Sequence, residues 1–595
     1  MNVATPTANP ARGGRHIRLS RLFGGIGSSA LALLPFVMLF AFVFVLPTIY
    51  FFRYAASPTA WVKALGEPGL VAVLGRTMLI SAEVTVLCSM LGYVYAVGMV
   101  RAGRRLRMVL LAALVVPFLS GDLIRTYAWL ITLGQSGPIN AGLETLFGDA
   151  GRVQLLYTRP GLLIGMVNVL LPVFVLPTFA ILAGVPPSLN GAARTLGANR
   201  IEAFLSVEVP LSMPGAGAGA LLVFISALGF YVTPSLLGGS GDSMLAQRID
   251  VEVSRLLSLP AAAVLAATLA GIVGACLVLF RAVYPLELLF VRTSTAPQRS
   301  TAGGDAAPGA RTLANARAGM RQRLQPLIVV LSRVPFGRLA VLGGIGLAIY
   351  LIFPLVVILP VSFSGEDFLR FPPQTFSTRW YESVIGDPQW RLAFGNSILV
   401  AAIATTIAVA AGLPLALAIV RGRLSGRLRA GLMALAALPA VTPIIVYAIG
   451  IYVWYLTFHL VGNRVAIGAA HAILALPYVL FIVMASLRDL DIRYEQAARS
   501  LGAGPWMTFR RITIPLIARS FISGAMFAFL VSFNEFLVAR SIASLDTTTL
   551  PIKLWTGARE EISPALAAVA ALGVGLSLAA GLVGMVIARF RSRAQ

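Results

Sequence analysis

Cysteine and histidine are nearly absent from this sequence of 595 residues. It holds two cysteines, Cys88 and Cys276, and three histidines, His16, His459 and His471. Both cysteines fall within long apolar runs, and no histidine lies near a carboxylate or a cysteine at the spacing of metal ligands. The sequence therefore predicts neither a disulfide framework nor a metal site.

Lysine is equally scarce, since Lys63 and Lys553 are the only lysines among 47 basic residues. A phosphate-binding loop of the form Gly-x4-Gly-Lys-Ser/Thr needs a lysine directly after its second glycine. Neither lysine has that context, and no polar stretch approaches the length of a nucleotide-binding domain. We therefore expect no catalytic residues and no cofactor in this chain.

Charge of either sign is sparse, because 12% of the residues are charged, 58% are hydrophobic and the mean hydropathy is +0.86. One or two soluble cores could not bury so much apolar surface. A membrane span needs about 20 apolar residues to cross roughly 30 Å of hydrocarbon. The sequence predicts twelve helical spans, of which the third covers 108–133 and the ninth 428–454.

Acidic residues are fewer than basic ones, 23 against 47, which leaves a formal net charge of +24. The arginines gather in the first 21 residues, at Arg101–Arg107, between Arg292 and Arg338, at Arg421–Arg429 and at the C-terminus. If both termini are cytoplasmic, all of these clusters lie on the cytoplasmic side, as the positive-inside rule requires. We therefore interpret the charge as a topology signal and not as a nucleic-acid surface.

The chain repeats itself, and the repeat sets its domains. Residues 75–101 align without a gap on 395–421, and Gly191–Pro210 matches Gln496–Pro515 at eight of twenty positions, at an offset of 305. We predict a basic cytoplasmic tail (1–30), a six-span half (31–291), a basic linker (292–338) and a second six-span half (339–595). The polar segments, 189–214 and 494–519, lie between the fourth and fifth spans of each half and thus on the cytoplasmic side.

The two polar segments share features of a docking element. Each contains a pair of alanines, a glycine four residues after the second alanine, and a proline at the start of the next span. Small side chains allow close approach to a partner, and glycine permits the sharp turn that ends a short helix. A solvated loop with a helix cap is the plainer alternative, but a second copy at the matching position favours docking.

This pattern resembles the EAA loop of ABC importer permeases, Glu-Ala-Ala, three residues, Gly, nine residues and Ile-x-Leu-Pro, with Gly191 and Gln496 in place of the glutamates. The resemblance implies that two copies of a separate ABC ATPase subunit, which binds ATP and Mg, dock on the segments. It also implies a periplasmic or lipid-anchored solute-binding protein. The expected ATPase-coupling residues are Ala192, Ala193, Gly197, Gln496, Ala497, Ala498 and Gly502.

Three further stretches, 116–140, 224–239 and 532–555, resemble the permease subunits of spermidine/putrescine-type importers. The chain is thus similar to a fused pair of such subunits. The resemblance implies an all-α integral membrane protein of the bacterial inner membrane, with two tandem six-helix bundles of the type I importer kind about a pseudo-twofold axis. It implies a small charged solute such as a polyamine, another amine, an opine or an aminophosphonate, with ferric iron or thiamine as alternatives.

Polar side chains inside spans are costly and are candidates for the solute pathway. Carboxylates beside aromatic rings would suit an ammonium group through charge and cation–π attraction. We name as pathway candidates Glu83, Asp122, Tyr127, Trp129, Phe230, Tyr231, Asn534 and Glu535.

Structural roles remain open for several of these side chains. Asp122 could pair with Arg125 on one helical face, and Glu83 could pair with a neighbouring span. Asn168 and His471 are expected to form hydrogen bonds between helices, and the tyrosines and Trp129 could anchor the interface of the membrane.

Two other classes of protein fit twelve spans in two repeats. A proton-coupled secondary carrier would need protonatable groups at the midplane and would leave the paired docking segments unexplained. A membrane scaffold would need neither the paired segments nor charges in its spans. Dependence on a separate ATPase distinguishes the ABC permease from both.

Overall fold

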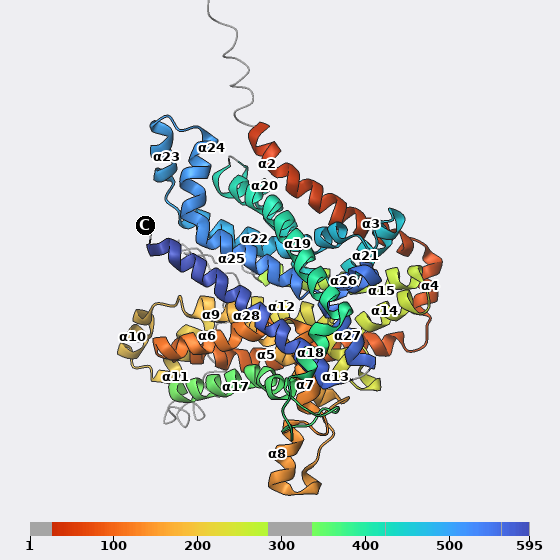
Figure 1. Cartoon of the computed structure of the whole chain (residues 1–595). Helices are drawn as coiled ribbons and strands as arrows, with labels where there is room; N and C mark the ends of the chain where they lie inside the picture. Colours follow the sequence, from red (N-terminus) through yellow and green to blue (C-terminus); the bar gives the residue numbers. More distant parts are fainter. Residues whose placement is uncertain (1–26, 284–335, 423, 561, 594–595) are drawn as a thin grey trace, which may run out of the picture.

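The computed structural model describes residues 27–283, 336–422, 424–560 and 562–593 (Figure 1). The predicted tail up to residue 26, and the predicted linker up to residue 335, lie outside the described residues. Within them the chain is helical and has no strand, only an isolated bridge between Ser364 and Phe376. The predicted all-α membrane fold is confirmed.

The first half contains helices of two kinds, long apolar spans and short connecting helices. They are α2 (Gly27–Phe40), η1 (Ala41–Val45), α3 (Leu46–Phe52), η2 (Arg53–Ala55), α4 (Pro58–Leu65), α5 (Leu70–Arg101), α6 (Arg104–Leu119), α7 (Asp122–Leu133), α8 (Pro138–Phe147), η3 (Asp149–Gly151), α9 (Arg159–Leu182), α10 (Pro187–Thr195), α11 (Arg200–Ala203), η4 (Phe204–Glu208), α12 (Val209–Leu228), α13 (Val232–Leu237), η5 (Ser240–Asp242), α14 (Leu245–Ser254) and α15 (Leu259–Val283).

The second half follows the same order of long and short helices. They are α17 (Phe336–Ser362), α18 (Arg379–Gly386), α19 (Pro388–Arg421), α20 (Gly426–Val441), α21 (Ile444–Thr457), α22 (Arg464–Asp489), α23 (Ile492–Ser500), α24 (Pro505–Thr508), η7 (Phe509–Thr513), α25 (Ile514–Phe533), α26 (Leu537–Ile542), η8 (Leu545–Thr547), α27 (Leu550–Glu560) and α28 (Pro564–Arg593).

Two of the twelve predicted spans are broken. Ten helices of the described chain are long and apolar enough to cross a membrane, or up to twelve if each of two bent pairs counts as one span. The pair α6 and α7 bends by 101°, and the pair α20 and α21 bends by 95°. The spans predicted at 108–133 and 428–454 are therefore bent pairs of helices, and the predicted number of twelve holds if each pair counts as one span.

The two breaks have different local causes. Gly121, between α6 and α7, has a φ of 78°, which glycine adopts without strain. Between α20 and α21, Pro443 has no amide hydrogen to donate, and it holds the preceding Thr442 in an extended conformation with a ψ of 130°. Glycine and proline thus produce the same bend in the two halves.

The first span of each half packs on the other half. The α2–α3 segment contacts α19, α21 and α22, while α17 contacts α5, α6 and α7. The ring centroids of Phe44 and Tyr447 lie 5.5 Å apart, and those of Trp129 and Tyr350 5.4 Å apart. The two halves of the sequence are therefore interlocked in space.

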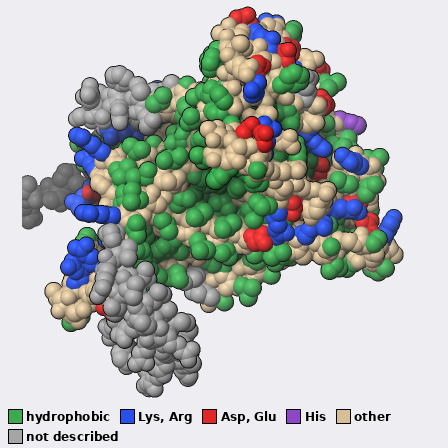
Figure 2. Space-filling model, turned by 90° about the horizontal axis from the view of Figure 1, so that it is seen from below, with side chains coloured by type: hydrophobic (Ala, Val, Ile, Leu, Met, Phe, Trp, Pro, Cys, Tyr) green, Lys and Arg blue, Asp and Glu red, His purple; other side chains and the backbone are tan. Residues whose placement is uncertain are grey.

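The surface is divided in the way a bilayer demands. In Figure 2 a broad hydrophobic area crosses the middle of the visible face, with basic side chains at its left edge and charges of both signs towards the right. Exposed apolar side chains on the long helices, such as Val86, Met90 and Ile349, belong to this lipid-facing surface. Helices such as α5, with 32 residues, are long enough to cross the hydrocarbon layer of a bilayer.

Candidate functional site

The two polar segments, which are the predicted docking elements, have the same order of helices and turns. Each is a short helix (α10 or α23), a turn, one helical turn (α11 or α24) and a π-helical segment that leads into the fifth span. Gly197 and Gly502 adopt φ values of 92° and 85° in the turn. Their amides donate to the backbone carbonyl oxygens of Arg194 and Arg499, at 3.0 Å in both copies. The predicted glycine turns are confirmed.

Both docking elements lie on one side of the molecule, at the left of Figure 1, with α23 and α24 above and α10 and α11 below. In each turn one leucine, Leu196 or Leu501, is 88% exposed. Each docking element therefore has, at the same position, an exposed apolar side chain that is suited to contact with a partner.

The seven predicted coupling residues all lie on these elements. The first alanine of each pair, both glycines and Gln496 are exposed, whereas Ala193 and Ala498 are partly buried. A Cβ atom added to Gly197 or to Gly502 would meet nothing within 4 Å. The surface therefore has room for a partner at the turn, although no partner chain is present here to test the prediction.

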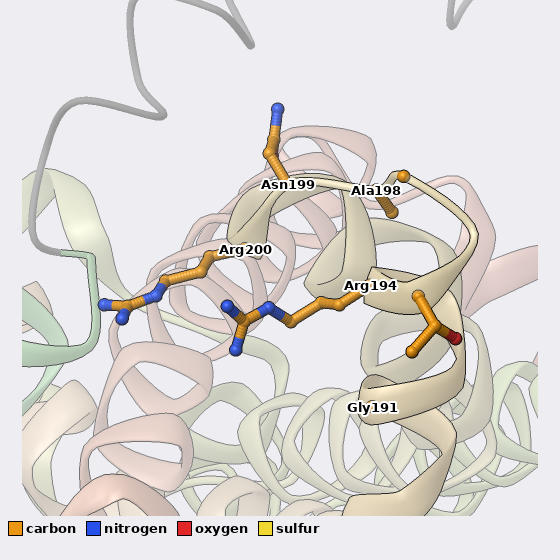
Figure 3. Close-up of a pocket in the computed structure, with 7 residues that line it drawn as sticks. Gly191, Arg194, Ala198, Asn199 and Arg200 are labelled. Carbon is orange, nitrogen blue, oxygen red and sulfur yellow. The ribbon is translucent and has the colours of Figure 1, made fainter.

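The first docking element also carries a hollow lined by basic residues. Figure 3 shows the side chains of Arg194 and Arg200 extending towards the same side of this hollow, with Asn199 at its rim. The Asn199 side chain accepts hydrogen bonds from Ile201 and Glu202, and Glu202 accepts one from the Asn199 amide, a capping box that fixes α11. The hollow is thus a rigid, positively charged part of the docking surface.

The breaks in the bent spans meet the ends of the fifth spans from the opposite half. Asn534, which follows α25, donates to the carbonyl oxygen of Leu119 at the end of α6, at 3.0 Å. The equivalent contact places Gly229, which follows α12, against Pro443. The predicted candidate Asn534 therefore joins the two halves at the break and satisfies a free helix-end carbonyl.

Glu535 is buried within the protein and has specific partners. Its oxygens accept from the amides of Val538 and Ala539 at 2.9 and 2.8 Å and so cap α26. One oxygen also lies 3.1 Å from His471 Nε2, and His471 Nδ1 lies 2.9 Å from the hydroxyl of Ser532. The predicted interhelical role of His471 is confirmed, and Glu535 helps to hold α22 and α26 together.

Asp122 and Arg125 form the ion pair that their spacing predicts, at 2.7 Å. Arg125 is 1% exposed and also donates to the carbonyl of Val169 at 3.1 Å, whereas the Asp122 side chain is 50% exposed. Asp122 is thus held at the break of α6 and α7 with an accessible carboxylate.

Glu83 also has a partner, as its alternative role predicts. Its carboxylate accepts from Arg159 at the start of α9, at 3.0 and 2.9 Å. Asn168 donates to the carbonyl of Tyr350 on α17 at 3.1 Å, which confirms its predicted interhelical role. The first pair connects α5 to α9 within the first half. The second connects α9 to α17, the first span of the second half.

The predicted aromatic candidates lie close to the contact between the halves. Tyr127 donates to the carbonyl of Ser563 at 3.0 Å, Trp129 packs on Tyr350, and Phe230 is partly buried beside the Gly229 contact. Tyr231 donates to Asp250 at 2.8 Å. The structure therefore gathers these candidates near one interface.

Sequence reasoning missed the ion pair that crosses this interface. Asp250 on α14 and Arg540 on α26 are 2.8 Å apart, although 290 residues separate them. Around them the ring of Tyr231 stacks near Phe536 and Trp555, at 6.5 and 5.5 Å. Both charged side chains occur on short helices between a fifth and a sixth span, and this was the available signal.

Comparison with known proteins agrees with this architecture. The model of the family described as "Binding-protein-dependent transport system inner membrane component" matches residues 408–592. The chain is 31% identical over 214 residues to the spermidine/putrescine transport system permease protein PotB of Salmonella typhimurium, which covers 36% of this chain and 75% of that protein. The chain belongs to this family.

Two further relatives support the assignment of this permease. The putrescine transport system permease protein PotI of Escherichia coli is 30% identical over 253 residues, which cover 41% of the permease and 88% of PotI. The probable ABC transporter permease protein y4fN of Sinorhizobium fredii is 29% identical over 490 residues, 79% of each chain. Family membership favours the ABC permease over the secondary carrier and the scaffold, and it makes the chain a multi-pass membrane transport protein.

Among the residues that the structure describes, no group of three or more His, Cys, Asp or Glu side chains could hold a metal ion. The Asp250 carboxylate at the interface instead lies beside the aromatic side chain of Tyr231. Such a combination can attract an organic cation.

Proposed function

We propose that the permease forms the transmembrane pathway of an ATP-driven importer and that each docking element binds one copy of a separate ABC ATPase subunit, which binds ATP and Mg. The observation that carries this proposal is the pair of docking elements with superposable turns and equally exposed leucines, Leu196 and Leu501. Two equivalent surfaces on one side of the molecule suit two copies of one partner.

The proposed orientation places the docking elements and both termini in the cytoplasm. The arginine ends of α5 and α19 and the end of α28 lie on the docking side, which agrees with the positive-inside rule. A periplasmic or lipid-anchored binding protein would then deliver solute to the side opposite the docking elements.

The proposed solute is a polyamine or a related small amine. The names of two relatives specify spermidine or putrescine. The Asp250 carboxylate beside Tyr231 offers charge and aromatic surface to an ammonium group, and Asp122 offers a second, half-exposed carboxylate.

The proposed pathway runs between the bent spans. In the conformation described here, Asp250 and Arg540 join the halves away from the docking side, and Asn534 joins them at the break of α6 and α7. Solute entry would require the ion pair to separate, and ATPase closure would supply this rigid-body movement.

The first experiment is purification of the permease from its native membrane, with identification of the proteins bound to it. We expect an ATPase with a phosphate-binding loop, and ATP-driven uptake of putrescine or spermidine by vesicles that contain the complex and its binding protein. Changing both turn glycines to valine should abolish ATPase binding, because a β-branched residue at these positive φ values costs about 1–2 kcal/mol per position.

Gly346→Ala provides the control for that experiment. Gly346 lies within α17, and an added Cβ atom would meet nothing within 4 Å. The control should retain the ATPase at the level of the unaltered permease. Recovery of the ATPase with the double valine variant, or uptake driven by a proton gradient without ATP, would contradict the proposal.

A further inference from the structure

Each docking helix is attached to the spans by one buried carboxylate. Helix α10 has no buried residue, and Glu495 is the single buried residue of α23. In the second half, Glu495 lies 3.3 Å from Arg421, the last residue of α19, and accepts from Thr513 at 3.0 Å. Arg421 also donates to the carbonyl of Leu490 at 2.9 Å.

The first half contains the same group of side chains in another order. Glu208, at the end of η4, accepts from Arg101, the last residue of α5, and from the side-chain amide of Asn190 on α10 at 2.6 Å. Glu208 is 4% exposed, as buried as its counterpart Glu495 at 5%. One arginine, one carboxylate and one neutral donor thus meet in both halves.

The carboxylate occupies different sequence positions in the two repeats. At the offset of 305 residues, Asn190 corresponds to Glu495, and Glu208 corresponds to Thr513. Arg101 and Arg421 correspond in the gapless alignment of 75–101 with 395–421. The docking helix supplies the carboxylate in the second half, and the π-helical segment supplies it in the first.

Retention of the three-part contact despite this exchange indicates that the contact itself matters. Within each docking element, no buried apolar side chain of α10 or α23 holds the helix to the spans. The arginine ends the second span, and the π-helical segment continues directly into the fifth span. The group therefore links the docking helix to two spans at once.

We propose that these two groups, Arg101–Asn190–Glu208 and Arg421–Glu495–Thr513, are positioning residues that transmit movement of the docking helices to the second and fifth spans. This inference rests on the proposed function, since it assumes an ATPase that moves the docking helices. A buried carboxylate paired with arginine resists separation, because each charge alone would be poorly solvated. Movement of α10 or α23 is therefore passed to α5 or α19.

The exchange between repeats supplies the test. Glu208→Thr removes the carboxylate of the first group, and the double variant Asn190→Glu/Glu208→Thr installs the arrangement of the second half. In the second half, Glu495→Asn removes the carboxylate, and Glu495→Asn/Thr513→Glu installs the arrangement of the first. Each double variant has the same residue types as a group that exists in the protein.

Movement is measured as a distance between spin labels at Met90 on α5 and Ala410 on α19, both exposed positions. The labels are introduced after replacing Cys88 and Cys276, the chain's two cysteines, with alanine. The complete complex with its ATPase is compared before and after trapping with ATP and vanadate, and the ATPase retained by each variant is measured in the same samples.

We expect the single variants to retain the ATPase but lose the distance change, and the double variants to restore it. A distance change in Glu208→Thr and Glu495→Asn equal to that of the unaltered groups would overturn the inference. Single and double variants that are equally defective would overturn it too, because rescue by exchange is the property that it requires. If no ATPase is bound even by the unaltered permease, the proposed function fails instead.

Discussion

The ion pair between Asp250 and Arg540 is the residue-scale contact with the clearest consequence for how the two halves are held together. It joins α14 to α26 across the two halves, and the Tyr231 hydroxyl donates to the same carboxylate. Their side chains are 18% and 27% exposed, so that water only partly screens the pair. Its loss should loosen the contact between the halves.

We predict that Asp250→Asn lowers the free energy of unfolding by about 1–3 kcal/mol, because Arg540 would keep its partly buried charge without its partner. Thermal unfolding of the purified permease, followed by tryptophan fluorescence, measures the change. Glu144→Gln is the matched control, since Glu144 pairs with Arg152 at an exposed site where ion pairs contribute about 0–1 kcal/mol. Equal effects of the two substitutions would remove the special role of Asp250.

Glu535 shows how far residue-level reasoning reaches. Its position inside an apolar span predicted an important carboxylate, and His471 was expected to bond between helices. The sequence could not predict that the two residues contact each other, since they belong to α22 and the turn before α26. Pairings between distant helices depend on packing that no local pattern encodes.

At the scale of elements, the broken spans are the main departure from the sequence prediction. Hydropathy detects apolar length, and both bent pairs have enough of it. It does not detect changes in helix direction. The signals for the breaks were Gly121 and Pro443, in stretches where Pro117 and Pro439 lie within the helices α6 and α20 without ending the spans there. The docking turns were predictable because two copies presented the same glycine.

The break between α6 and α7 gives a prediction about packing. A Cβ atom at Gly121 would lie 2.7–2.9 Å from atoms of Asn534, and the φ of 78° disfavours any other residue. We expect Gly121→Ala to destabilise the permease by about 1–3 kcal/mol, the range for overpacking and for a strained backbone. Thermal unfolding again provides the measurement.

A second substitution separates the two causes. Gly121→Ala/Asn534→Ala removes two of the three atoms that the new methyl group would meet, Oδ1 at 2.7 Å and Cγ at 2.9 Å, and leaves the positive φ unchanged. The double variant should therefore recover part of the lost stability beyond the effect of Asn534→Ala alone. Strict additivity of the two single substitutions would show that the close approach has no energetic effect.

At the scale of the whole molecule, the exchanged first spans make each half incomplete. The α2–α3 segment packs on α19, α21 and α22, and α17 packs on α5, α6 and α7. Composition and repeats predicted two six-helix bundles, but the exchange depends on contacts between residues far apart in the sequence. No periodicity within one span indicates which bundle that span joins.

We predict that the permease divided within residues 292–335 assembles from two separately expressed halves. Each half should be recovered in folded form only when the other is present, because its first span would otherwise lack its packing partners. Co-purification through a tag on one half, followed by thermal unfolding, measures this. Stable, separately folded halves would contradict the interlocked arrangement.

The interlocked arrangement also means that the first span is synthesised long before the helices on which it packs. Tyr50, at the end of the first span, and Thr457 are joined by a hydrogen bond of 3.2 Å, although 407 residues separate them. At a synthesis rate of about 5–20 residues per second, the first span waits roughly 20–80 s in the bilayer before its partner is made. During that interval lipid alone must solvate the helix, so the span has to be stable as a single inserted helix long before it becomes part of a bundle.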